Sequence, residues 1–191
     1  MKTIIVGCHG MLGMELMKAF ASVHETTGLD IEDLDIRNSE HCRDVIGNLR
    51  PDVIINAAAY TRVDDCEANE KEALQVNGHG AGNLAEAAAT AGSLLVHYST
   101  DYIFDGRKED GYLEEDAPNP QSVYGKSKLL GEALVQRAGG DHLIIRISWL
   151  FGPDGRNFIR TIIAAARDGG PLRVVDDQKG SPTYTRDLAA Q

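Results

Sequence analysis

Short apolar runs alternate along the chain with segments in which apolar residues recur every three or four positions. The runs typical of buried strands are Thr3–Val6, Val53–Asn56, Leu94–Ser99, Leu143–Ile147 and Leu172–Val175, with a weaker one at Glu25–Leu29. Helical spacing relates Leu12, Leu16, Ala19 and Phe20, and it recurs in segments around Cys42–Leu49, Leu84–Ala88, Tyr124–Leu134 and Ile159–Ala166. Strands that are apolar on both faces and alternate with helices indicate a parallel sheet covered by helices. We therefore predict an α/β fold of the Rossmann type, a doubly wound parallel sheet whose ligand crevice lies at the carboxyl ends of the strands.

A glycine-rich loop lies between the first predicted strand and the first predicted helix. Gly7, Gly10 and Gly13 are spaced so that the first permits a tight turn, the second a close approach to a pyrophosphate, and the third close packing of helix on strand. A helix N-terminus then stabilises the negative charge of the pyrophosphate. A plain strand–turn–helix is the alternative, but the strand before the loop and the amphipathic helix after it favour a dinucleotide site.

The residue that ends the second strand candidate bears on which dinucleotide is bound. Asp30 lies 23 residues after Gly7, where a carboxylate can accept hydrogen bonds from the adenosine ribose hydroxyls. Its neighbour Ile31 offers no positive charge to a 2′-phosphate, which favours NAD(H) over NADP(H). The side chain of Arg37 could still contact such a phosphate, so we expect either NADP(H) or NAD(H) as the cofactor.

A tyrosine and a lysine open a later helical segment and suggest the chemistry. Tyr124 and Lys128 are four residues apart, which places a phenol and an ammonium on one helical face. Reduction of a carbonyl needs a proton donor at its oxygen, and we expect Lys128 to favour the phenolate and lower the pKa of Tyr124. Thr100, at the end of the fourth strand pattern, is the candidate hydroxyl that holds the carbonyl, with Ser99 in reserve. A surface Tyr/Lys pair is the alternative, but beside a glycine loop the pair indicates nicotinamide-dependent carbonyl chemistry.

Composition narrows the functional classes. The chain has 191 residues, 42% of them hydrophobic and 25% charged, with a formal net charge of −10, which is typical of one globular domain and argues against nucleic-acid or acidic-membrane binding. No apolar run is long enough to predict a membrane span. Cys8, Cys42 and Cys66 fit no disulfide or metal framework, so we expect free thiols and a cytoplasmic protein. We expect no metal site: the acidic residues around Cys66 are typical of a solvated helix face, and His97 of a packed core.

Further sequence strings identify a family that the chain resembles. The glycine loop, the Tyr-x-x-x-Lys pair and the strand-end hydroxyl resemble the extended short-chain dehydrogenase/reductases. Four strings resemble, within that group, the dTDP-4-dehydrorhamnose reductase family along essentially the whole chain; they are Asn56–Thr61, Ser99–Gly106, Arg146–Trp149 and Gly180–Thr185.

The resemblance implies reduction of the 4-keto group of a nucleotide sugar, dTDP-4-dehydro-6-deoxy-L-mannose, to dTDP-L-rhamnose, a precursor of surface polysaccharide. Tyr124, Lys128 and Thr100 would then be catalytic. The implied cofactor residues are Gly7, Gly10, Met11, Leu12, Gly13, Asp30, Asp35, Ile36, Ala59, Tyr60, Thr61, Tyr124 and Lys128. The implied substrate residues are Thr100, Asp101, Trp149, Asn157, Phe158, Pro182, Thr183 and Tyr184.

The resemblance also divides the chain. Residues 1–150 would form the dinucleotide-binding Rossmann domain, and residues 151–191 would begin a substrate-binding lobe interleaved with the last sheet strand. The segment Thr185–Ala190 looks like the start of a helix, and relatives continue beyond it, so we expect a truncated chain in which this lobe is largely missing. The sequence leaves open whether the chain forms a homodimer.

Two other functions remain open. The regulatory subunit of methionine adenosyltransferase resembles this family and uses the fold as a binding module without catalysis. An epimerase or dehydratase acting on another nucleotide sugar would use the same site and recycle its bound cofactor. Trp149 and the Ser181–Tyr184 string favour the reductase over the binding module.

Overall fold

Five parallel strands form the central sheet of the computed structural model, which describes residues 1–191. The strands are β1 (Lys2–Val6), β2 (Glu25–Leu29), β3 (Val53–Asn56), β4 (Leu94–Thr100) and β5 (His142–Ile147). Their order is β2-β1-β3-β4-β5, and every neighbouring pair is parallel. β2 lies on one side of β1 and β3 on the other, so the strand order reverses at β1 and the crevice expected of a doubly wound sheet lies at its carboxyl end. The predicted fold class is confirmed.

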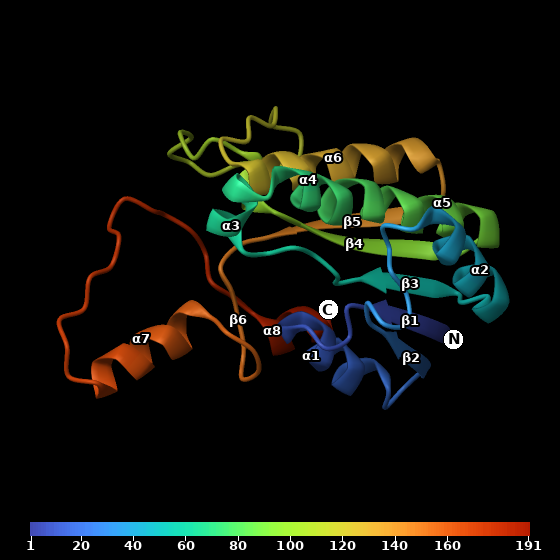
Figure 1. Cartoon of the computed structure of the whole chain (residues 1–191), viewed down its shortest axis with the longest axis horizontal. Coiled ribbons are helices and arrows are strands. Elements are labelled where there is room, and N and C mark those ends of the chain that lie inside the picture. Colours follow the sequence, from blue (N-terminus) through green and yellow to red (C-terminus); the bar gives the residue numbers. More distant parts are fainter.

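Helices cover both faces of this sheet (Figure 1). One face carries α2 (Ser39–Leu49), α5 (Ala81–Ala91) and α6 (Val123–Ala138), and the other carries α1 (Met11–Phe20) and α8 (Thr185–Ala190). The remaining helical elements are α3 (Val63–Ala68), α4 (Glu70–Ala73), the π-helix η1 (Leu74–Gly80), the 3₁₀-helix η2 (Asp101–Ile103) and α7 (Phe158–Arg167).

Alternate residues of β1 and β3 pack into two separate cores. Ile4 and Ile54 pack with α2 and α5 in the larger core, whereas Ile5 and Ile55 pack with α1 in the smaller one. All four side chains are at most 2% exposed. Full burial of such side chains stabilises the fold by about 1.5–3 kcal/mol each, which explains why the strands could be recognised as continuous apolar runs.

One predicted strand is wrong. Leu172–Val175 forms no strand; Leu172, Val174 and Val175 are 47, 52 and 66% exposed in the irregular segment that follows α7. A strand needs a neighbouring backbone to pair with, and this segment runs away from the sheet together with α7 (Figure 1). A small parallel pair that the sequence did not predict, β6 (Leu150–Phe151) with β7 (Thr183–Tyr184), connects the C-terminal segment to the body.

The three cysteines are buried free thiols, as expected. Burial raises the pKa of the Cys42 thiol to about 12 and also raises that of Cys8, so both thiols stay protonated at neutral pH. None of the helices combines the length and the apolar character needed to cross a membrane. The boundary predicted at residue 150 stays a prediction.

Candidate active site

The glycine loop has the geometry that its spacing predicts. Gly7 has a φ of +80°, and a Cβ there would lie 2.7 Å from the backbone nitrogen of Ala58. A Cβ on Gly13 would collide with the carbonyl oxygen of Gly7. Gly10 is the N-cap of α1, and no side chain caps that helix or places an acidic group in its first turn. The first N–H groups of α1 are therefore available to an anion, and the donor set fits a pyrophosphate.

Two adjoining cavities follow the carboxyl edge of the sheet. The smaller, of about 270 Å³, lies between the glycine loop and the β2–α2 connection. The larger, of about 590 Å³, lies between the glycine loop, the end of β4 and the start of α6. Gly10 and Ala57–Ala59 line both cavities, so the two form one elongated cleft. Such a cleft at the point where strand order reverses is the usual place for a dinucleotide in this fold.

Most of the predicted site residues line this cleft. The smaller cavity has Gly7, Gly10, Asp30, Asp35, Ile36 and Ala59, and the larger has Gly10, Met11, Leu12, Ala59, Thr61, Thr100, Asp101, Tyr124, Lys128 and Trp149. Gly13 acts through packing of the loop. The structure does not bring Tyr60, Asn157, Phe158, Pro182, Thr183 or Tyr184 to the walls of either cavity. Asn157 instead caps α7, Phe158 is 61% exposed, and Tyr184 stacks on Phe151. The roles of these six residues remain predictions.

Tyr124 and Lys128 lie one turn apart on α6, whose N-cap Ser122 accepts a hydrogen bond from the N–H of Gly125 at 3.1 Å. Burial raises the pKa of Tyr124 to about 12, and the Thr100 hydroxyl opposes this rise. Burial therefore outweighs any lowering of the Tyr124 pKa, and the effect expected of Lys128 stays a prediction. The Lys128 ammonium donates to the carbonyl of Tyr98 at 2.6 Å, and burial lowers its own pKa to about 8.

Thr100 and Asp101 occupy the end of β4, where the larger cavity opens. The Thr100 hydroxyl donates to Asp101 at 3.1 Å and accepts from the N–H of Tyr102 at 3.2 Å, which caps η2. Burial raises the pKa of Asp101. Ser99, the reserve candidate, is 3% exposed, and its hydroxyl has no partner. Two hydroxyls and one carboxyl thus lie beside the Tyr124 phenol in the lining of one cavity.

A buried ion pair anchors the same helix further along. Glu132, one turn after Lys128, accepts from Arg146 Nε at 3.0 Å and from Arg146 Nη2 at 2.8 Å. Arg146 also donates to the carbonyl of Glu114 at 3.0 Å and lies over the ring of Phe104. The guanidinium therefore connects β5 and α6 to the segment 104–122 that joins Thr100 to Tyr124. Glu132 also raises the pKa of Lys128, opposing the effect of burial.

An asparagine that the sequence analysis did not single out bridges the two halves of the site. Asn77, on η1, is 1% exposed; its amide accepts from Tyr60 N–H at 2.8 Å and donates to the Tyr60 carbonyl at 3.0 Å. It also donates to Ser127 Oγ at 2.9 Å, and Ser127 donates to the carbonyl of Tyr124 at 2.7 Å. Asn77 thus fixes the loop after β3 relative to the Tyr124 helix. The only sequence signal was the Asn77-Gly78 pair inside a segment with helical spacing of apolar residues, such as Ala73 and Val76.

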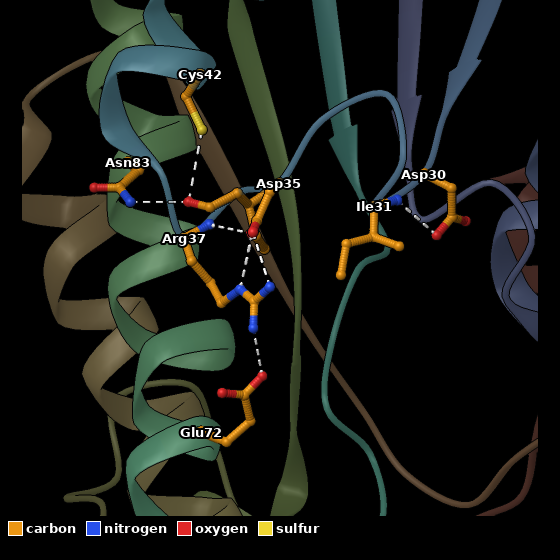
Figure 2. Close-up of polar contacts among 8 residues, drawn as sticks. Asp30, Ile31, Asp35, Arg37, Cys42, Glu72 and Asn83 are labelled. Carbon is orange, nitrogen blue, oxygen red and sulfur yellow. Dashed lines mark hydrogen bonds and ion pairs between the residues drawn. The ribbon is translucent and has the colours of Figure 1, made fainter.

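The smaller cavity has a charged rim (Figure 2). Asp30 accepts from the N–H of His9 and of Ile31, each at 2.9 Å, which fixes its carboxylate at the end of β2. On the opposite side, the guanidinium of Arg37 lies between the carboxylates of Asp35 and Glu72. Cys42 and Asn83 both donate to the carbonyl of Ile36, which fixes the backbone directly before Arg37 (Figure 2).

The sheet, the glycine loop and the Tyr/Lys helix define a Rossmann domain of the short-chain dehydrogenase/reductase class. The chain belongs to the family described as the RmlD substrate binding domain, whose profile matches residues 1–191.

Named relatives agree with this assignment. The dTDP-4-dehydrorhamnose reductase of Burkholderia thailandensis is 41% identical over 99% of this chain, and the spore coat polysaccharide biosynthesis protein SpsK of Bacillus subtilis is 41% identical over 98%. The crystal structure of dTDP-4-dehydrorhamnose reductase from Bacillus anthracis in complex with NADP superposes with a TM-score of 0.96 at 39% identity, over 98% of this chain and 67% of that one. The chain spans 63% of the length of the Burkholderia relative and 67% of the Bacillus subtilis relative.

Proposed function

We propose that this chain carries the dinucleotide-binding and proton-donating part of an NAD(P)H-dependent reductase. Its reaction is reduction of the 4-keto group of dTDP-4-dehydro-6-deoxy-L-mannose to dTDP-L-rhamnose. The single observation that carries the proposal is that the glycine loop, Thr100, Tyr124 and Lys128 all line one continuous cleft. The names of the relatives, which include dTDP-4-dehydrorhamnose reductases, support the choice of substrate.

The protein groups supply binding, orientation and a proton. The N–H groups at the start of α1 bind the pyrophosphate, and a reduced nicotinamide, when bound, supplies the hydride. Tyr124 gives its phenolic proton to the ketone oxygen as negative charge develops there. Because its pKa is about 12, Tyr124 is fully protonated at neutral pH, and an alkoxide is basic enough to take the proton. The Thr100 hydroxyl, which favours the ionised form of Tyr124, then stabilises the phenolate that is left and orients the ketone, and the Lys128 ammonium binds the nicotinamide ribose.

The two other candidate functions predict different outcomes with the same substrate. A regulatory binding module binds a dinucleotide but consumes none. An epimerase or dehydratase recycles its cofactor, so it shows no stoichiometric oxidation of NAD(P)H. The phenol, hydroxyl and ammonium of the cleft form a complete proton-donating set, which favours the reductase over the binding module.

The test measures NAD(P)H oxidation with the 4-keto sugar nucleotide by the wild-type chain and by Tyr124→Phe. We expect stoichiometric oxidation by the wild type and a fall in kcat of about 100-fold or more in Tyr124→Phe, which is typical for loss of a general acid. Tyr102→Phe is the matched control, since it removes a phenol from the same cavity whose ring packs edge-on against Tyr124. Equal rates in wild type and Tyr124→Phe would contradict the assignment of the proton donor.

We also propose a cytoplasmic location. The support for it is that three buried thiols remain free of disulfides, which suits a reducing compartment.

A further inference from the structure

The segment that borders the adenosine end of the cleft is strongly acidic. Between β2 and α2 the chain reads Asp30-Ile31-Glu32-Asp33-Leu34-Asp35-Ile36-Arg37, with four carboxylates and one cation. Asp30, Asp35 and Arg37 all line the smaller cavity, beside the glycine loop. A phosphate monoester at the ribose 2′ position carries a charge of about −1.5 to −2 at neutral pH, so the sign of the local charge matters here.

The one cation of this segment is already engaged by two carboxylates. Arg37 Nε and Nη2 donate to Asp35 over distances of 2.8–3.2 Å, and Nη1 donates to Glu72 at 2.7 Å. Both partners raise the pKa of Arg37, and Arg37 lowers the pKa of Asp35. Figure 2 shows the guanidinium turned toward Glu72 and away from Asp30. One positive charge between two negative charges leaves this side of the cavity with a net negative charge.

Glu72 reaches this cluster from a distant part of the sequence. It lies on α4, 35 residues after Arg37 in the sequence, and its side chain is 47% exposed. Asp35 alone would leave the Nη1 side of the guanidinium free to bind an anion; Glu72 occupies that side. The sequence alone allowed Arg37 to reach a 2′-phosphate, and the contact with Glu72 removes that option.

At the end of β2 the remaining groups suit a hydroxyl and not a phosphate. Asp30 is held by two backbone N–H groups and can accept from the ribose hydroxyls. Ile31 is 55% exposed and supplies no charge. A 2′-phosphate placed here would meet the carboxylate of Asp30, and the one ring beside it, His9 with Nδ1 3.6 Å from Asp30 Oδ2, carries a positive charge only when protonated.

We infer that the adenosine end of this cleft selects an unphosphorylated ribose, so that the chain binds NADH more tightly than NADPH, and that Glu72 enforces the selection by holding Arg37. The inference rests on the proposed function, in which the cleft binds a dinucleotide. The Bacillus anthracis relative was solved in complex with NADP, so membership of the family does not by itself give this preference.

Isothermal titration calorimetry on the whole chain with NADH, NADPH, 5′-AMP and adenosine 2′,5′-bisphosphate tests the inference without requiring turnover. We expect NADH to bind at least about tenfold more tightly than NADPH, and 5′-AMP more tightly than the bisphosphate. Salt screens repulsion, so the preference for NADH should shrink as ionic strength rises from about 0.05 to about 0.5 M. Over this range the Debye length falls from more than about 10 Å to less than about 10 Å. Attraction between a phosphate and a free arginine would give the opposite trend.

Three variants locate the cause. Glu72→Gln removes a negative charge and replaces a charge-assisted hydrogen bond to Arg37 by a weaker neutral one that a phosphate can displace, so NADPH affinity should rise by about five- to tenfold while NADH affinity stays constant. Glu70→Gln, an exposed position on the same helix without an ion pair, is the matched control and should change neither affinity. Arg37→Gln combined with Glu72→Gln should cancel most of the gain, because the freed cation is then absent.

The outcomes separate this inference from the proposed function. NADPH affinity equal to or above that of NADH, or an unchanged ratio in Glu72→Gln, would overturn the selection while leaving the dinucleotide site intact. Failure of both dinucleotides and both fragments to bind would overturn the proposed function and this inference together.

Discussion

Removal of one partner of the Glu132–Arg146 ion pair should destabilise the protein more than removal of one partner of any surface pair. Glu132 is 3% exposed and Arg146 24% exposed at their side chains, and two charge-assisted hydrogen bonds of 2.8 and 3.0 Å join them. Removing one partner of a buried pair typically costs about 3–5 kcal/mol, because the other charge is left without compensation. Arg146 keeps its bond to Glu114 and some water, so we expect about 3 kcal/mol for Glu132→Leu.

Removal of the arginine should lower the free energy of unfolding more than removal of the glutamate. In Arg146→Met the carboxylate of Glu132 is left almost without water, so we expect about 4 kcal/mol. The double variant Glu132→Leu/Arg146→Met replaces both charges by apolar groups and should lie within about 1 kcal/mol of wild type. The coupling between the two positions is therefore about 6 kcal/mol by this reasoning, far above the few tenths found for independent sites.

Urea unfolding followed by circular dichroism measures these free energies, and thermal unfolding gives a second reading. For a chain of this size about 3 kcal/mol corresponds to a fall in Tm of about 6–12 °C. Asp116→Asn is the control, since it breaks the exposed pair with Lys108 and should cost far less than either change at the buried pair. If the double variant lost the sum of the two single losses, the charges would not be coupled and the reasoning from burial would be refuted.

Two further predictions concern the glycine loop and the buried lysine. Gly13→Ala should weaken NADH binding at least about tenfold and lower the free energy of unfolding by about 1–3 kcal/mol, because the new Cβ would meet the Gly7 carbonyl oxygen. Gly47→Ala is the matched control: its Cβ has open space, so it should stabilise α2 by up to about 1 kcal/mol. Calorimetry measures the binding and urea unfolding the stability of both variants. The pKa of Lys128 is about 8 in the folded chain against an ordinary value of 10.5, so between these values the unfolded chain binds more protons and stability rises with pH. Relative to Lys128→Met, the wild type should gain on the order of 3 kcal/mol across that window, and a flat difference would show that Lys128 is not desolvated.

The sheet and its helices were predictable because their signals are local. Runs such as Thr3–Val6 and Val53–Asn56 differ by at most one residue at either end from β1 and β3. A strand is a property of two backbones, however, so the equally apolar run Leu172–Val175 gave a wrong prediction where no partner lies beside it. The glycine loop and the Tyr/Lys spacing were likewise local, and both lie in the predicted cleft.

The features that sequence reasoning missed depend on distant partners or on burial. Asn77 acts through Tyr60 and Ser127, which are 17 and 50 residues away, and no spacing rule connects them. The contact between Glu72 and Arg37 has the same character. The raised pKa of Tyr124 follows from how deeply α6 sits against β4 and η2, which composition and periodicity do not reveal.

The π-helical turn at Leu74–Gly80 carries a consequence for how this segment tolerates changes in length. A π-turn accommodates one residue more than an α-turn, and each residue of a helix advances its azimuth by about 100°. Removal of a single residue from this turn would restore regular α-helix and swing Asn77 off the Ser127 hydroxyl, while also moving Gly78 and Gly80 out of the positions where α6 and Ile36 pack against them. Substitutions in this stretch are thus far better tolerated than indels, and homologous chains that preserve the bridge are expected to preserve its residue count.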